Sequence, residues 1–215
     1  MIDIVREIQS TQREVGESRA PDGATIRSVR LRRDLQAPIE DVWDALTNPE
    51  RIGRWFLPIS GDYRLGGRYQ FEGNAGGEIL VCEAPNRLKA TWVYGEMSDG
   101  ISEVEIRLTR LDDERTRFEF DHSATVPEEQ WGQFGPGAVG VGWDGGLLGL
   151  SLHLQGGSVG DGVAWQLSDE GRAFLTKSSE AWGAAHRASG ADEETVATGV
   201  ANTTSFYAPD PEAVS

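Results

Sequence analysis

The stretch GAVGVGWDGGLLGLSLHL, residues 137–154, decides how the rest of this chain is interpreted. Its glycines oppose a helix, because each interior glycine costs about 1 kcal/mol relative to alanine. Its apolar residues nevertheless recur at helical spacing: Val139, Trp143, Leu147, Leu150 and Leu154. The spacing therefore predicts one long helix over residues 137–154 that depends on tertiary packing for its stability.

Four glycines of this stretch also recur at helical spacing and form a smooth stripe on the predicted helix: Gly142, Gly145, Gly146 and Gly149. A stripe without side chains has two uses. It either lets another backbone approach closely or leaves volume for a ligand. The pattern alone leaves both alternatives open.

The beginning of the stretch matches the G-x-G-x-x-G dinucleotide fingerprint over residues 135–140, and Asp161 lies at about the distance expected for a ribose contact. That fingerprint must directly join a buried parallel strand to a helix. Here the preceding predicted strand is amphipathic and ends well upstream. Dinucleotide binding is therefore a disfavoured alternative.

Upstream of residue 135, several short segments alternate apolar and polar residues, which is typical of half-buried strands. The first begins at Ile26 and places Val29, Leu31 and Leu35 on one side. Turn signals such as Gly66-Gly67 separate the later segments. Short connections between alternating strands predict a curved antiparallel sheet of about six strands around the long helix.

Two short helices are predicted between the first strand and the remaining ones. Pro38 suits a first helical position, and Val42 and Leu46 then share an apolar face. Asn48 can cap a second helix that ends near Phe56. The predicted fold class is therefore α+β.

Both ends of the chain are predicted to be helical additions to one domain. Residues 1–25 contain an amphipathic helix followed by a linker, because apolar residues up to Val15 fall near helical spacing before Gly16. Residues 26–155 form the domain. Residues 156–215 form a C-terminal extension whose helices are capped by Ser168 and Asp192.

The composition argues against several classes of partner. The 20 basic and 35 acidic side chains give a net charge of −15, which repels nucleic acid and anionic lipid surfaces. The charged N-terminus does not fit a signal peptide, and no apolar stretch is long enough for membrane insertion. Cys82, the single cysteine, is predicted to be a small core residue. We therefore expect a cytoplasmic protein.

The order of elements resembles the helix-grip fold of the START and Bet v 1 superfamily, also called SRPBCC, over about residues 26–154. Within it, the chain is similar to the subfamily named for the activator of the heat-shock protein 90 ATPase homologue. The motifs that carry this similarity are Ala37-Pro38, Val42-Trp43-Asp44-Ala45-Leu46-Thr47, Pro49-Glu50, Trp55-Phe56, Gly66-Gly67-Arg68-Tyr69 and Gly142-Trp143. The resemblance implies a cavity between sheet and long helix, which relatives use for lipids, sterols, hormones or polyketides.

Large side chains on the inward sides of the predicted elements are the candidate ligand-binding residues. They either fill the core or line the cavity. The candidates are Trp55, Phe56, Tyr69, Phe71, Trp92, Tyr94, Phe118, Phe120, His122, Trp143, Leu147 and Leu150.

Two residues are candidates for acid–base chemistry. His122 continues the inward parity of Phe118 and Phe120, so it either acts on a ligand or is a core histidine bonded to a backbone carbonyl. Asp144 is either a buried carboxylate with a raised pKa or a residue that faces solvent. The chain has three histidines, His122, His153 and His186, and their spacing does not fit a metal site. No metal or cofactor is predicted.

Three functions remain open from the sequence. The leading hypothesis is cofactor-free binding of a small apolar molecule such as a lipid or polyketide. The second is an acid–base enzyme, a cyclase, dehydratase or hydrolase-like protein, that uses His122 together with Asp144 or a cavity tyrosine. The third is a stress-associated or co-chaperone-like module that contacts a protein partner or a second copy through Phe174, Trp182 and Tyr207 of the C-terminal extension.

Overall fold

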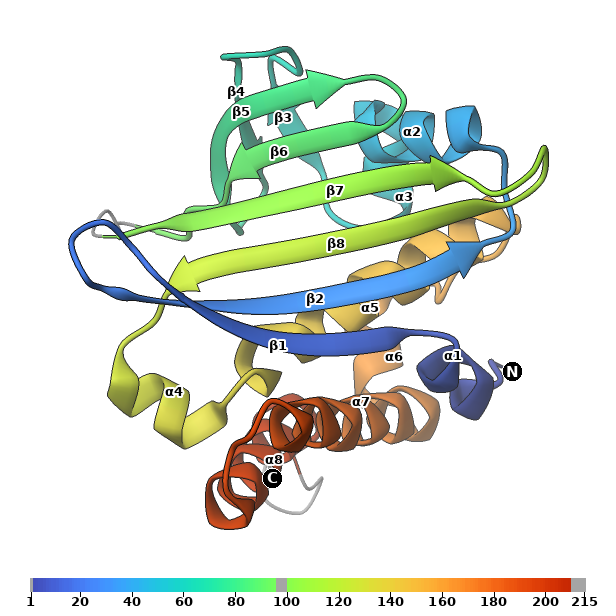
Figure 1. Ribbon diagram of the computed structural model, residues 1–215. Coiled ribbons are helices and arrows are strands. Elements are labelled where there is room, and N and C mark those ends of the chain that lie inside the picture. The colour runs from blue at the N-terminus through green and yellow to red at the C-terminus, as the bar shows by residue number, and fades with distance from the viewer. Residues whose placement is uncertain (1, 96–99, 210–215) are drawn as a thin grey trace.

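The computed structural model describes residues 2–95 and 100–209. It is an α+β structure in which a curved, open sheet of eight antiparallel strands partly surrounds the long helix α5 (Gly137–Leu154) (Figure 1). The helix has the bounds that the sequence predicts. The helix-grip architecture is thereby confirmed.

The sheet has the strand order β1-β2-β8-β7-β6-β5-β4-β3. The six later strands form a meander, and β2 extends it by pairing along its length with β8, from Ile26 opposite Thr125 to Leu35 opposite Thr116. The strands are β1 (Gln12–Arg19), β2 (Thr25–Leu35), β3 (Ile59–Gly61), β4 (Arg68–Phe71), β5 (Gly76–Glu83), β6 (Arg87–Thr91), β7 (Ser102–Arg110) and β8 (Thr116–Thr125).

The helices begin where the capping residues predict. The side chains of Asn48, Ser168 and Asp192 each accept a hydrogen bond from a backbone N–H of the first turn. Besides α5, the helices are α1 (Ile4–Gln9), α2 (Ile39–Thr47), α3 (Pro49–Trp55), α4 (Glu128–Phe134), α6 (Gly162–Leu167), α7 (Asp169–Ala188) and α8 (Glu193–Tyr207). None of the helices in the described ranges is both long and apolar enough to span a bilayer.

The N-terminal segment differs from its prediction. The helix ends at Gln9, and the residues expected to finish the helix and begin the linker form β1 at the edge of the sheet. Val15 pairs with Val29 of β2, and a Cβ at Gly16 would lie 2.6 Å from the Ser28 hydroxyl oxygen, so glycine permits this close pairing. Pairing with a distant strand outweighs the weak helical spacing of this segment.

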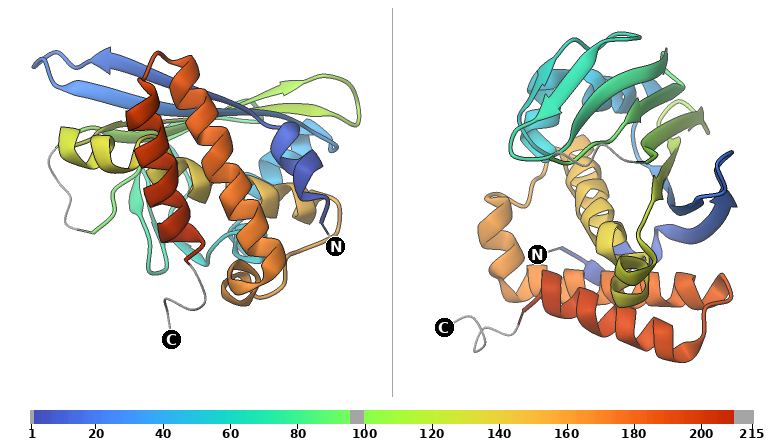
Figure 2. Two further views of the ribbon diagram at one scale, coloured as in Figure 1. Left: turned by 90° about the horizontal axis from the view of Figure 1, so that it is seen from below. Right: turned by 90° about the vertical axis from the view of Figure 1, so that its left-hand side faces the viewer.

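The C-terminal extension is part of the core. In Figure 2, α7 and α8 lie against the side of α5 that faces away from α2 and α3. Phe174 and Trp182 are 2% and 0% exposed, and the half-buried Tyr207 donates a hydrogen bond to the Ala138 carbonyl oxygen at 2.8 Å. The expectation that these side chains present a contact surface is wrong, because they pack inward. A protein partner at this extension stays a prediction.

Two burial predictions in the meander are also wrong. Cys82, predicted to be a small core residue, is exposed near the end of β5, after the register shift between Ile79 and Val81. Tyr94 is 59% exposed because β6 ends at Thr91, so the alternation that placed it inward does not continue. The end of the chain after Pro209, part of the predicted extension, lies outside the described residues.

Candidate ligand cavity

A cavity of about 120 Å³ lies between the concave side of the sheet, α5, and the elbow formed by α2 and α3. The side chains of its wall are apolar or aromatic apart from two tyrosine hydroxyls. The lining residues are Leu31, Leu46, Ile52, Trp55, Phe56, Ile59, Tyr63, Tyr69, Phe71, Ile79, Leu88, Ala90, Trp92, Val104, Ile106, Phe118, Phe120, Trp143, Gly146, Leu147 and Leu150.

Ten of the twelve candidate residues lie in this wall, and Tyr94 and His122 do not. Sequence reasoning missed most aliphatic members, such as Val104 and Ile106, although their alternation with polar residues in β7 is a signal that places them on one side of the strand. Periodicity indicates the side on which a residue lies but does not show whether it borders empty space. That distinction requires the packed structure.

Aromatic rings from separate elements contact one another around the cavity. The ring centroid of Trp143 on α5 lies 4.3 Å from that of Phe120 and 4.8 Å from that of Trp92. Phe56, at the end of α3, meets Phe71 edge-to-face at 5.0 Å. Edge-to-face contact is a favoured geometry of aromatic pairs, so these rings stabilise the wall as well as border the space.

The glycine stripe of α5 serves both predicted uses at different positions. A Cβ at Gly149 would lie 2.4 Å from the Trp55 carbonyl oxygen, so this glycine lets the backbone of α3 approach. Trp55 is further held by its indole N–H, which donates to the Ala45 carbonyl oxygen at 3.0 Å. Gly146 borders the cavity, and its nearest neighbour would be the Phe56 ring at 3.6 Å. The stripe therefore combines close packing and free volume.

His122 points inward, as its parity predicts, but lies behind Trp143. The Trp143 indole N–H donates to His122 Nδ1 at 3.1 Å, and Ser102 Oγ lies 3.3 Å from Nε2. Its partners are thus side chains rather than the backbone carbonyl expected of a core histidine. Burial lowers the pKa of His122 to about 4, so the ring is neutral at pH 7 and carries its proton on Nε2.

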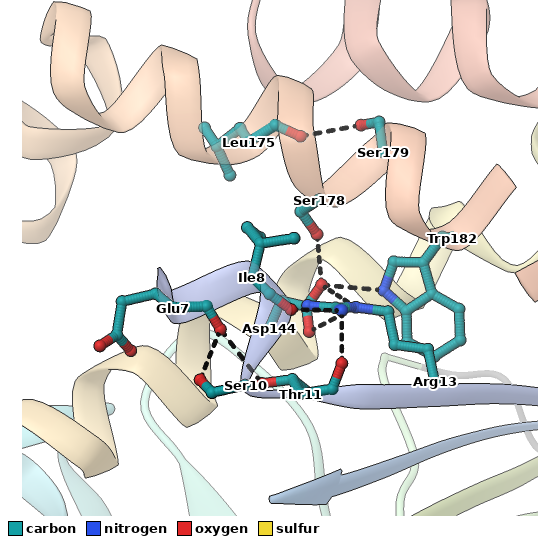
Figure 3. A network of polar contacts seen from close by, with 10 residues as sticks. All are labelled: Glu7, Ile8, Ser10, Thr11, Arg13, Asp144, Leu175, Ser178, Ser179 and Trp182. Atoms are coloured by element: carbon teal, nitrogen blue, oxygen red, sulfur yellow. Dashed lines mark hydrogen bonds and ion pairs between the residues drawn. The ribbon is translucent and has the colours of Figure 1, made fainter. Parts of the chain in front are cut away.

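Of the two alternatives for Asp144, the structure shows the buried one, and Asp144 is not among the lining residues of the cavity. Figure 3 shows its carboxylate between Arg13 and the side chains of α7, so it lies on the side of α5 that faces α7. Both its carboxylate oxygens accept from Arg13 Nε, at 2.9 and 3.2 Å. The Ser178 hydroxyl and the Trp182 indole N–H also donate to it. Burial raises the pKa of Asp144, while Arg13 and the two neutral donors act in the opposite direction. Through these hydrogen bonds, the Asp144 side chain connects α5 with α7 and with the N-terminal segment.

Two buried arginines of this region were not singled out from the sequence. Arg13 also donates from Nη1 to the carbonyl oxygens of Ile8 and Thr11, at 3.0 and 2.9 Å. Arg33 of β2 forms an ion pair with Glu7 at 2.7 Å and donates to Ser151 Oγ at 3.0 Å. The available signal was the parity of Arg33, which shares the inward side of β2 with its apolar residues.

The cavity has only two ionisable lining side chains among the described residues, both tyrosines. The Tyr69 hydroxyl donates to the Thr91 carbonyl oxygen at 2.6 Å. Burial raises the pKa of Tyr63 to about 12 and also raises that of Tyr69, so both are neutral at pH 7. The two ranges that the structure describes contain no group of three acidic, histidine or cysteine side chains arranged to hold a metal ion.

Solved structures with this architecture include CalU16 from Micromonospora echinospora, which is 38% identical over 82% of this chain and 98% of CalU16, with a TM-score of 0.66. DynU16, from the dynemicin biosynthetic locus, is 26% identical over 61% of this chain and 48% of its own, with a TM-score of 0.50. The Aha1 dimer from Colwellia psychrerythraea is 20% identical over 59% of this chain and 95% of its own, with a TM-score of 0.51, and shows likeness of fold alone.

The chain matches none of the curated proteins with which it was compared. A family model described as Activator of Hsp90 ATPase homolog 1-like protein matches residues 36–151, more than half of the 215-residue chain. The match spans the α2–α3 elbow, the meander and most of α5, which are the elements that enclose the cavity. This chain belongs to the family of Activator of Hsp90 ATPase homolog 1-like proteins.

Proposed function

We propose that this protein binds a small apolar molecule in the cavity between the sheet and α5. The observation that carries the proposal is an unfilled volume of about 120 Å³ inside an apolar, largely aromatic wall. A cavity of similar size in another protein, about 150 Å³ and lined by apolar side chains, stays dry and binds benzene. A volume of this kind therefore favours an apolar guest over water.

The acid–base alternative lacks a catalyst in this geometry. His122 does not border the cavity in the described structure, and its Nδ1 already accepts the Trp143 indole proton. Asp144 lies on the opposite side of α5 and is paired with Arg13. A general base must lie within hydrogen-bond reach of its substrate, and neither group borders the cavity. Binding is thus better supported than catalysis.

The origin of one similar protein supports a metabolite as the ligand. DynU16, which is 26% identical to this chain, comes from the dynemicin biosynthetic locus. Proteins of biosynthetic loci encounter small intermediates and products. Among the ligands expected from the sequence, we therefore favour a polyketide or another apolar metabolite over a membrane lipid.

The experiment that tests the proposal uses toluene as an uncharged apolar probe. Binding to the folded state raises the unfolding temperature, by more as the toluene concentration exceeds its dissociation constant, and saturation-transfer NMR detects contact with the protein. We expect both signals for the natural sequence. Mass spectrometry of small molecules retained by the natively purified protein then identifies the natural ligand.

Two leucine substitutions on α5 locate the bound probe. Gly146→Leu places a side chain at the cavity wall, whereas a Cβ at Gly145 meets no atom of the described structure within 4 Å. Gly145→Leu is therefore the matched control, because both changes remove a helical glycine. We expect toluene binding to fall in the Gly146 variant alone. Equal binding by both variants would contradict the proposal.

A further inference from the structure

We infer that the ligand of this cavity is an uncharged aromatic molecule rather than a fatty acid or another charged amphiphile. The inference rests on the proposed function and specifies the chemical class that the same site accepts. It is carried by three independent properties of the wall: its lack of charge, the arrangement of its rings and its volume.

The first property is charge. Of the described lining residues, none is an arginine, lysine, histidine, aspartate or glutamate. Tyr63 and Tyr69 are the only ionisable ones, and burial raises the pKa of both, so both are neutral at pH 7. An ion buried without a partner loses several kcal/mol of hydration free energy. The wall therefore disfavours carboxylates, phosphates and ammonium groups.

His122, which contacts the lining residue Trp143, is also neutral at pH 7. His122 lies behind Trp143, and its pKa is lowered to about 4 by burial. Protonation would also convert Nδ1 from an acceptor into a donor, which would break its hydrogen bond with the Trp143 indole N–H. His122 therefore does not supply a counter-ion for an anionic ligand at pH 7.

The second property is the arrangement of the rings. Phe56, Phe71 and Trp92 form one group of mutual contacts, with centroids 5.0 to 6.5 Å apart, and Trp143 joins that group to Phe120. The planes in these pairs are tilted or perpendicular, so the rings that border this one cavity differ in orientation. Faces are negative and edges are positive, so an aromatic guest can complement both, whereas an alkyl chain has no matching quadrupole.

The third property is volume. The 120 Å³ of free space is somewhat smaller than the ~150 Å³ that holds benzene in another protein. Pockets for drug-sized ligands measure about 300–1,000 Å³. One aromatic ring therefore fits with little rearrangement, and two fused rings fit after small movements of side chains, whereas a long acyl chain requires a much larger displacement.

The test compares matched probes that differ in one property at a time. 2-Naphthol and 2-naphthoate share an aromatic ring system and differ in charge at pH 7. 1-Decanol and decanoate likewise share an alkyl chain and differ in charge. We expect 2-naphthol to bind at least about tenfold more tightly than 2-naphthoate, because burial of an unpaired carboxylate costs more than about 1.4 kcal/mol. We also expect 2-naphthol to bind more tightly than 1-decanol. Isothermal titration calorimetry measures each dissociation constant.

A variant that adds a cation to the wall reverses the preference. Leu88 and Ile106 are half-buried lining residues that pair across β6 and β7. Either Ile106→Arg or Leu88→Lys should strengthen binding of 2-naphthoate and weaken that of 2-naphthol. The second variant serves if the first does not fold.

The outcomes separate this inference from the proposed function. If the natural sequence binds 2-naphthoate at least as tightly as 2-naphthol, or decanoate at least as tightly as 1-decanol, the ligand is not restricted to uncharged molecules. The cavity would still be a binding site. If 1-decanol binds at least as tightly as 2-naphthol, the preference for an aromatic ligand is overturned. Failure of all four probes, together with failure of toluene, would overturn the proposed function itself.

Discussion

The two sides of α5 are packed differently, although the residues that face them are neighbours in the sequence. Trp143 borders an unfilled apolar cavity, while Asp144, the next residue, enters a buried polar network that joins both ends of the chain. The space around the glycines also differs between the two sides. A Cβ at Gly140 would lie 2.3 Å from the Trp182 ring, whereas a Cβ at Gly146 would have its nearest neighbour at 3.6 Å. One side of the helix is thus closely packed for stability, and the other retains space for a ligand.

The largest effect is expected on the closely packed side. Asp144→Asn removes the charge that pairs with the buried Arg13, and an uncompensated buried charge costs about 3–5 kcal/mol. Urea denaturation measures the loss of unfolding free energy. The control is Asp44→Asn, which removes a half-exposed partner of Arg51 and should cost about 1 kcal/mol or less. Equal losses in the two variants would contradict the assigned difference between buried and exposed pairs.

The second effect is a pH dependence that arises behind the cavity wall. The pKa of His122 is lowered from 6.5 to about 4 in the folded state, so below pH 6.5 the unfolded chain binds a proton that the folded chain does not. His122 therefore reduces stability as the pH falls from about 6.5 to 4, by about 3 kcal/mol in total. Denaturant titrations at several pH values measure the slope.

The matched variant for this pH dependence is His122→Asn. Its side-chain oxygen can still accept from the Trp143 indole N–H, but it does not titrate. We expect the stability difference between the natural sequence and this variant to change over the pH window from about 6.5 to 4. A difference that is independent of pH would show that His122 is not held neutral by burial.

A smaller effect compares the glycines of the two sides directly. Gly140→Ala forces a methyl group into the Trp182 ring and should cost about 1–3 kcal/mol. Gly146→Ala places its methyl group at ordinary contact distance from Phe56, so it should be neutral or stabilising by up to about 1 kcal/mol. Thermal unfolding distinguishes the two. Destabilisation by both would indicate that the Gly146 side is as closely packed as the other.

The smallest effect is expected at Tyr94, which the sequence placed in the cavity. Because its side chain is exposed, Tyr94→Ala should change stability by about 0.5 kcal/mol or less and leave toluene binding unchanged. NMR titration with toluene is the measurement. Weaker binding in this variant would indicate that the cavity extends beyond β6.

Local patterns predicted the elements that make up the cavity. The spacing of Trp143, Leu147 and Leu150 predicted α5, and the caps at Asn48 and Ser168 predicted where helices begin. These signals succeed because helical periodicity and capping involve residues within a few positions of one another. Local signals failed at β1, whose structure depends on pairing with β2.

The buried network shows why the opposite side of α5 was unpredictable. Arg13 and Asp144 are 131 positions apart, and no periodicity relates them. The strand parity of Arg33 and the apolar surroundings of Asp144 are signals compatible with burial, but neither identifies the partner of the charge. Such pairs form only when folding brings the N-terminal segment and α7 next to α5.

The sequence by itself determined the long glycine-rich helix, the alternating strands and the inward position of most aromatic rings, because each follows from the spacing of nearby residues. The tertiary structure decided what the glycines do, which charges are buried and where space remains. Those properties depend on rotamers and on contacts between segments far apart in the chain. Only after the rings of Trp92, Phe120 and Trp143 have packed does an apolar volume of about 120 Å³ remain between them and the elbow.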